Sequence, residues 1–297
     1  MEWIPLTPQV SVLRDVINCG VIRGQGDQAI VVDTGVGDRS GQRIARALAQ
    51  QGLRPVAVLT THAHGDHTGG HAYLTREAGA LVYAPLPDAT VIQYPVWGTL
   101  ALFGGAEPVL ELSSSKLTAT PAPLHAVITP GPLHLAGITV QAVALPGHTG
   151  GHTGYLSDGV LFLGDLLAGE DEMERAIPYL YSVGMKLESL ARLERLQPAW
   201  GVPAHHPPCR NLGPLITANR AAIEETLEMV RRAVRGRAAD AAEILQAVCR
   251  QKGVSPSKIT DFLLLQPTVY SYISYLHNRG ELQFRLEDGR LLWFLPS

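Results

Sequence analysis

The chain has 297 residues, of which 46% are hydrophobic and 17% are charged. These values exclude a disordered or fibrous chain and allow a large buried core without disulfide crosslinks. The formal net charge is −3, so no general basic field attracts nucleic acid or a membrane surface.

The sequence carries no evident signal for secretion or for insertion into a membrane. Its three cysteines, Cys19, Cys209 and Cys249, lie far apart and form no Cys-x-x-Cys pair. Residues 1–5 lack a basic region before an apolar run, and no apolar stretch reaches the ~18 residues of a membrane span. We therefore expect a soluble cytoplasmic protein in a reducing compartment, with no membrane partner.

The first part of the chain alternates between expected strands and helices. Residues 18–23 and 28–32 are short apolar runs separated by a Gly-Gln-Gly-Asp turn, and residues 56–60 form a buried strand. Residues 39–51 have helical periodicity, and residues 68–78 are compatible with a helix. This alternation of strands and helices indicates an α/β sandwich.

The middle of the chain is interrupted by prolines, glycines and a run of serines. We expect a long loop over residues 85–132, of the kind that carries function. Strands are expected at residues 133–145 and 155–163. Helices are expected at residues 184–196, where leucine recurs every three residues, and at residues 214–235.

An Arg-Gly-Arg sequence then separates two expected domains. We expect a catalytic domain over residues 1–235 and a small domain over residues 236–297. In the small domain, helices at residues 240–251, from residue 255 and at residues 267–278 precede two short strands joined by a Glu-Asp-Gly turn. Three helices followed by a hairpin are typical of a winged-helix domain.

The most informative stretch is His62-Ala63-His64-Gly65-Asp66-His67. It directly follows the expected buried strand, where side chains two residues apart point the same way, so His62 and His64 can bind one ion together. Asp66 and His67 lie beyond a glycine and can face a second ion. Imidazole and carboxylate ligands without thiolate suit Zn²⁺, and also Mn²⁺ or Fe²⁺. The alternative is a solvated, histidine-rich loop.

This stretch, H-A-H-G-D-H-T-G-G over residues 62–70, resembles the signature of the metallo-β-lactamase-fold superfamily. The resemblance implies a four-layer αββα sandwich over the catalytic domain. The tail resembles the winged-helix-like domain of the β-lactamase-like protein 2 group. Further sequence motifs similar to those of the family follow the same order along the chain: Asp33-Thr34-Gly35, Pro146-Gly147-His148-Thr149, Leu163-Gly164-Asp165 and Val202-Pro203-Ala204-His205. The last of these motifs has Ala204 where the family has glycine.

The resemblance also implies a site for two divalent metal ions. Such a concentration of histidines and aspartates would be costly to bury without a metal to pair with them. Each of these motifs also follows an apolar strand, where α/β folds place their ligands. The implied ligands are His62, His64 and His148 for one ion, Asp66, His67 and His205 for the second, and Asp165 as the bridge between both.

Five further residues are candidates for supporting roles. The resemblance implies that Asp33 supports the loop of residues 62–67, which carries candidate ligands. His71, on the helix after this loop, is expected to form hydrogen bonds that hold the ligands in position. His152, Tyr179 and Tyr181 are candidate substrate contacts, although a packing role is the alternative for each.

The implied reaction is hydrolysis of a small ester, thioester or lactone. A hydroxide shared by the two ions at neutral pH would attack the carbonyl centre, with Asp66 orienting it. Two alternatives remain open. One is an endoribonuclease or phosphodiesterase of the β-lactamase-like protein 2 type, and the other is a persulfide dioxygenase with a single iron.

The tail is not expected to recognise nucleic acid sequences. Residues 236–297 carry seven basic and six acidic side chains, and the expected helix at residues 267–278 contains no lysine or arginine for phosphate contacts. We instead expect the tail to pack against the catalytic domain or to mediate a homodimer.

Overall fold

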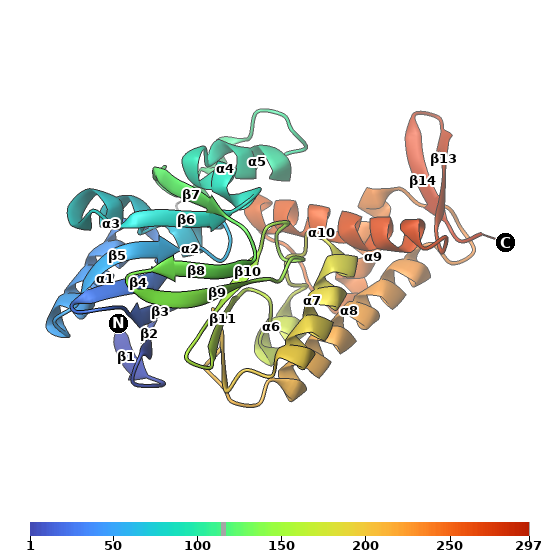
Figure 1. Ribbon diagram of the computed structural model, residues 1–297. Helices are drawn as coiled ribbons and strands as arrows, with labels where there is room; N and C mark the ends of the chain where they lie inside the picture. The colour runs from blue at the N-terminus through green and yellow to red at the C-terminus, as the bar shows by residue number, and fades with distance from the viewer. Residues whose placement is uncertain (114–116, 297) are drawn as a thin grey trace.

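The computed structural model describes residues 1–113 and 117–296. Two β-sheets pack face to face, and helices cover the outer face of each sheet (Figure 1). The expected four-layer αββα sandwich is therefore confirmed.

The first sheet contains seven strands in chain order. Strands β1 to β4 pair antiparallel, whereas β4 to β7 pair parallel. Parallel neighbours need crossover connections, and helices α1 and α3 provide two of them, with Ile44, Leu48 and Leu74 buried against the sheet. The elements are β1 (Glu2–Pro5), β2 (Val10–Arg14), β3 (Asn18–Arg23), β4 (Gln28–Val32), α1 (Gly37–Gln50), β5 (Arg54–Leu59), α2 (Gly65–Thr68), α3 (His71–Ala78), β6 (Leu81–Pro85) and β7 (Leu124–Ile128).

The second sheet contains five strands in the order β12-β11-β10-β9-β8. Its inner face meets the first sheet so closely that a Cβ on Gly20 would lie 2.5 Å from the ring of Phe162. The expected strands at 133–145 and 155–163 are each split into a hairpin, because Ala136-Gly137 and Asp158-Gly159 adopt positive φ angles that turn the chain. The strands are β8 (Gly131–Leu135), β9 (Ile138–Ala144), β10 (Thr153–Ser157), β11 (Val160–Gly164) and β12 (Trp200–Pro203).

The expectation of one long loop over residues 85–132 is wrong. This segment contains α4 (Asp88–Gln93), α5 (Val96–Leu102), a short 3₁₀ helix (Leu110–Leu112) and the parallel strand β7. Its prolines and glycines weaken the local pattern, but buried side chains such as Ile92 hold the short elements against the body of the protein. Residues 114–116 of this segment lie outside the described residues.

The expected count of three helices after residue 236 is also wrong. The second and third expected helices form one continuous helix, α10 (Ile259–Asn278), with Pro267 inside it. Proline removes one backbone hydrogen bond from a helix, but Leu263 and Val269 on either side are buried and keep the two halves in place. The remaining elements are α6 (Glu170–Arg175), α7 (Val183–Leu196), α8 (Gly213–Ala233), α9 (Ala241–Lys252), β13 (Gln283–Glu287) and β14 (Arg290–Phe294).

The C-terminal helices share one hydrophobic core with the second sheet. Val248 of α9 and Ile273 of α10 belong to the same buried cluster as Leu161 of β11 and Leu190 of α7. Figure 1 shows α9 and α10 beside α7 and α8, with the β13–β14 hairpin projecting at the end. In the described ranges, no helix combines the length and the apolar character needed to cross a membrane.

Candidate metal centre

The candidate ligands come from the ends of strands in both sheets. His62 and His64 follow β5, and the short helix α2 presents Asp66 and His67. Asp165 directly follows β11, in the second sheet. His148 lies between β9 and β10, and His205 lies two residues beyond β12. The edge where the strands of the two sheets end therefore collects all seven side chains.

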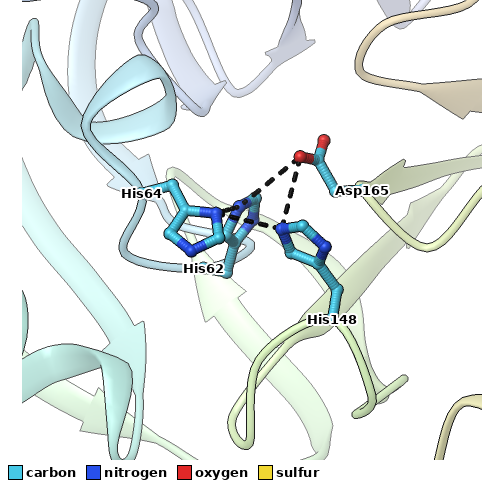
Figure 2. Close-up of side chains that lie close together, drawn as sticks. All are labelled: His62, His64, His148 and Asp165. Carbon is cyan, nitrogen blue, oxygen red and sulfur yellow. Dashed lines mark hydrogen bonds and ion pairs between the residues drawn. The ribbon is translucent and has the colours of Figure 1, made fainter. Parts of the chain in front are cut away.

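Four of these side chains form the first ligand group: His62, His64, His148 and Asp165 (Figure 2). His64 Nδ1 lies 3.0 Å from His62 Nε2 and 2.9 Å from His148 Nε2. Asp165 Oδ2 lies 3.8 Å from His62 Nε2 and 3.4 Å from His148 Nε2. Burial holds the pKa values of His62 and His148 well below the usual range, so both imidazoles stand neutral, as metal ligands must.

The second ligand group contains Asp66, His67 and His205. His205 Nε2 lies 3.7 Å from Asp66 Oδ2. The two groups meet at Asp165, because its other oxygen, Oδ1, lies 3.2 Å from His67 Nε2 and 3.5 Å from His205 Nε2. One carboxylate thus presents Oδ2 to the first group and Oδ1 to the second.

Two buried atoms in this arrangement lack the partners that a protein interior normally supplies. His67 Nε2 and Asp165 Oδ1 are buried, and neither has a hydrogen-bond partner among the described residues. Such atoms are costly to bury unless something else satisfies them. Imidazoles and carboxylates, with no thiolate in either group, form a donor set for Zn²⁺, Mn²⁺ or Fe²⁺. The residues present therefore fit two divalent ions.

Asp33 forms a hydrogen bond with the candidate ligand His67 on the side of the ring away from the ligand group. Its Oδ2 accepts hydrogen bonds from His67 Nδ1 at 2.8 Å and from Thr61 Oγ1 at 2.7 Å, and its Oδ1 accepts one from the Thr61 backbone at 2.8 Å. With Nδ1 donating to Asp33, His67 presents Nε2 to the second ligand group. Asp33 itself has a φ of 56°, a conformation that aspartate and asparagine tolerate better than most residues.

We expect Asp33→Asn to weaken binding at the second ligand group about 10- to 100-fold, because the amide cannot replace the charge that orients His67. Asparagine keeps the shape and tolerates the backbone conformation, so the effect is confined to the hydrogen bonds. Competition titration with a chromophoric zinc chelator measures it. Asp38→Asn, on the exposed start of α1, is the matched control. Equal affinity in both variants would contradict an orienting role for Asp33.

His71 and His152 are structural residues. His71 is buried and bonded through both ring nitrogens, to Thr34 Oγ1 and Thr60 Oγ1 at 2.7 Å each, so it supports the metal loop only indirectly. For His152 the geometry favours the packing role over a substrate contact, because its side chain is fully buried. His152 Nδ1 donates to the Leu145 carbonyl, and Nε2 accepts from the backbone N–H of Asp165. Burial lowers the pKa of each histidine to about 3.

The second ligand group contains His205 and not its neighbour His206. His206 Nδ1 lies 3.1 Å from the Pro207 carbonyl, and its side chain belongs to neither ligand group. We expect His205→Ala to remove one of two bound ions, and His206→Ala to leave both. Elemental analysis of the purified variants measures this. The opposite pattern would show that Ala204 marks a shifted register.

Five of the seven candidate ligands line a wide cleft of about 1230 Å³: His64, Asp66, His148, Asp165 and His205. Tyr179 lines it, with ring centroids 5.3 Å from His64 and 5.4 Å from His148, and its backbone carbonyl lies 3.2 Å from His148 Nδ1. Burial raises the pKa of Tyr179 to about 12. Tyr181, in contrast, is 55% exposed and lines a separate hollow beside α10. The geometry therefore keeps Tyr179 as a candidate substrate contact and places Tyr181 outside the cleft.

Sequence reasoning missed two buried charged residues near the ligands. Asp88 accepts hydrogen bonds from the backbone of Ala63 at 2.8 Å, from Thr149 Oγ1 at 3.1 Å and from the Gly151 backbone at 3.0 Å. It thereby ties the loop that carries His62 and His64 to the loop that carries His148. The second is Lys186, which lines the cleft with its side chain almost entirely buried. Neither residue lies in a recognisable motif.

Comparison with known proteins agrees with this geometry. The sequence pattern of a family described as the metallo-beta-lactamase superfamily matches residues 12–205. The hydroxyacylglutathione hydrolase of Xanthomonas axonopodis pv. citri is 35% identical over 140 residues, which are 47% of this chain and 42% of that protein. The match thus spans less than half the length of that relative. The lactamase-like protein ptaB of Pestalotiopsis fici is 25% identical over 283 residues, which are 92% of this chain and 79% of that protein.

Solved structures share the fold. A beta-lactamase domain protein from Burkholderia ambifaria superimposes with a TM-score of 0.78 at 24% sequence identity, over 99% of this chain and 94% of that chain. A metallo-beta-lactamase family protein from Thermus thermophilus superimposes with a TM-score of 0.72 at 20% sequence identity, over 99% of this chain and 97% of that chain. At these identities the likeness shows the fold alone, including the helices after residue 205.

Proposed function

The chain belongs to the metallo-beta-lactamase superfamily, and on this basis we propose that it is a hydrolase that uses two divalent metal ions to cleave a small thioester, ester or lactone. Zn²⁺ is the preferred ion, with Mn²⁺ and Fe²⁺ as alternatives, because the donor set contains only imidazole and carboxylate groups.

The observation that carries this proposal is the position of Asp165. Its two carboxylate oxygens face two separate ligand groups, which is the arrangement that a carboxylate bridge between two ions requires. Burial alone would raise the pKa of Asp165, but the charge of His67 and the close contacts with His67 and His205 hold it well below its usual range. The bridge therefore stays ionised at neutral pH.

When bound, two divalent ions supply a water of lowered pKa and an electrophile for the carbonyl oxygen. The chain's own residues do the rest. Asp66 lines the cleft and lies on the second ligand group, so its carboxylate can accept a hydrogen bond from the attacking water and orient it. Tyr179 forms a wall of the cleft beside His64 and His148, where it can limit the position of the acyl group.

A thioester is the bond that we favour. Relatives of this chain include several hydroxyacylglutathione hydrolases, and these act on thioesters. The lining of the cleft argues against a nucleic acid substrate, because it is rich in carboxylates that would repel a phosphodiester backbone. Among the described residues of the lining, the charged side chains besides the candidate ligands are the acidic Glu170, Asp171, Glu172 and Asp261 and the basic Arg175 and Lys186.

The test is metal analysis followed by a substrate panel. We expect two ions per chain after reconstitution with Zn²⁺, and turnover of small acyl thioesters that disappears on chelation and returns with added metal. The panel should also contain an ester, a lactone, single-stranded RNA and a glutathione persulfide. One iron per chain with oxygen uptake on the persulfide would favour the dioxygenase alternative. Metal-dependent cleavage of RNA without thioester turnover would favour the endoribonuclease.

A further inference from the structure

Lys186 is a buried cation at the inner end of the cleft. It lies on the first turn of α7, and only 6% of its surface is exposed. The residue lines the same cleft as the ligands His148 and Asp165 and the candidate substrate contact Tyr179. Its Nζ donates a hydrogen bond to the backbone carbonyl of Asp165 at 3.2 Å. The ammonium group therefore lies directly beside the residue that would bridge the metals.

The backbone fixes Lys186 in this position. Gly147, next to the ligand His148, has a φ of 137°, and a Cβ at this position would lie only 2.5 Å from the Cα of Lys186. Ser189, one turn further along α7, donates a hydrogen bond to the Pro146 carbonyl at 2.6 Å. Helix α7 thus packs directly on the loop that carries His148, and this packing fixes the backbone of Lys186 beside that loop.

The ammonium group has more N–H donors than the described residues offer acceptors. Lysine offers three N–H donors, and the Asp165 carbonyl is the only acceptor for them within the described ranges. Within the same ranges, no carboxylate oxygen lies within the 4.0 Å of an ion pair with Nζ. The charges of Asp165 and Glu172 act on this ammonium group only from beyond ion-pair distance. A buried ammonium with no carboxylate in direct contact is costly, and a ligand carboxylate would offset that cost.

We propose that Lys186 binds a carboxylate group of the substrate, so that the acyl compound cleaved at this centre carries a negative charge close to its scissile bond. This inference rests on the proposed function, because it concerns a ligand in the same cleft. A single carboxylate fits better than a phosphate, since among the described residues of the lining Lys186 is the only buried cation, and the surrounding acidic side chains disfavour further negative charge.

The alternative is that Lys186 only holds the backbone of Asp165 in place. The two roles differ in what they predict for ligands of different charge. A positioning residue would change metal content and turnover equally for charged and neutral ligands. A carboxylate-binding residue would change the discrimination between them.

The first experiment measures binding without turnover, so its outcome does not depend on which bond the enzyme cleaves. Calorimetry with the Zn²⁺-loaded protein compares malonate, succinate and glutarate with their monoamides. Each pair retains one carboxylate that can bind a metal ion, and only the second group differs in charge. We expect the diacid of at least one length to bind about tenfold more tightly than its monoamide, which corresponds to about 1.4 kcal/mol.

The same measurement on variants assigns that preference to Lys186. The quantity compared is the ratio of diacid affinity to monoamide affinity. We expect Lys186→Met to bring this ratio close to one and Lys186→Arg to retain most of the preference, because arginine keeps the charge. Lys252→Met is the matched control, since Lys252 pairs with Glu225 and does not line the cleft. Elemental analysis of each variant shows whether both ions are still bound.

Three results would overturn the inference. They are a ratio near one in the unaltered protein at all three lengths, a ratio that survives in Lys186→Met, and a ratio that falls equally in Lys252→Met. If Lys186→Met loses its metal, the unaltered protein and Lys186→Arg provide the test. The inference requires the diacid preference in both, and its absence from either one contradicts the inference. A charge preference that is present without any thioester turnover would refute the proposed reaction and leave the carboxylate site standing.

Discussion

Asp165→Ala is expected to reduce kcat by roughly 10³-fold or more, which corresponds to a loss of about 4 kcal/mol of transition-state stabilisation. Among the described residues, only Asp165 faces both ligand groups, with Oδ2 at 3.4 Å from His148 Nε2 and Oδ1 at 3.2 Å from His67 Nε2. Without it, no described side chain would join the two groups. We expect the variant to bind at most one ion per chain, measured by elemental analysis beside steady-state kinetics on the best substrate of the panel.

A matched control separates this effect from a general change of charge in the cleft. Asp171→Ala also removes one carboxylate from the lining, but Asp171 is exposed at the start of α6 and belongs to neither ligand group. We expect it to retain two ions and most of the turnover. Circular dichroism should show folded protein in both variants. Near-normal kinetics in Asp165→Ala would remove Asp165 from the active centre.

Removal of residues 236–297 is expected to prevent the rest of the chain from folding as a soluble protein. These residues supply a large share of the core beneath the second sheet, and their loss would uncover the apolar faces of α7 and α8. The buried residues that would be lost from this core are Ala239, Ile244, Leu245, Val248, Cys249, Val269, Tyr272, Ile273, Leu276 and Leu282. Solubility, near-ultraviolet circular dichroism and thermal unfolding of the shortened protein provide the test.

Two point variants test the same idea in the full chain. Leu276→Ala removes a fully buried side chain of α10 and should cost about 2–5 kcal/mol in the free energy of unfolding. Leu286→Ala, on the β13–β14 hairpin, removes a side chain that is 77% exposed and should change stability little. If the shared core makes one cooperative unit, Leu276→Ala lowers a single transition. Two separate transitions, with only one of them lowered, would show that the tail folds independently.

The ligand residues could be identified from the sequence because their signal is local. His62, His64, Asp66 and His67 lie within six residues, directly after a buried strand, and this spacing alone indicates metal binding. Several helices were predictable for the same reason. Helix α9, for example, begins at Asp240, whose side chain and that of Glu243 form a reciprocal capping box.

Elements with a weak local pattern were not predictable. The segment over residues 85–132 contains proline and glycine at positions that favour loops, yet tertiary burial holds α4, α5 and β7 in place. Pro267 suggested the start of a new helix, whereas packing on both sides continues α10 through it. In each case the free energy of burial outweighs a local preference of about 1–3 kcal/mol.

The sequence by itself indicated metal binding at His62, His64, Asp66 and His67, because their spacing is short, and its resemblance to a known family implied the fold and the distant candidate ligands His148, Asp165 and His205. Only the tertiary structure decided how distant segments meet. The two oxygens of Asp165 face ligands from different sheets, Asp88 ties together two ligand loops that are 84 residues apart at His64 and His148, and α7 brings Lys186 within 3.2 Å of the Asp165 carbonyl. Such contacts leave no trace in local composition, because they arise from the packing of surfaces that the chain brings together only when it folds.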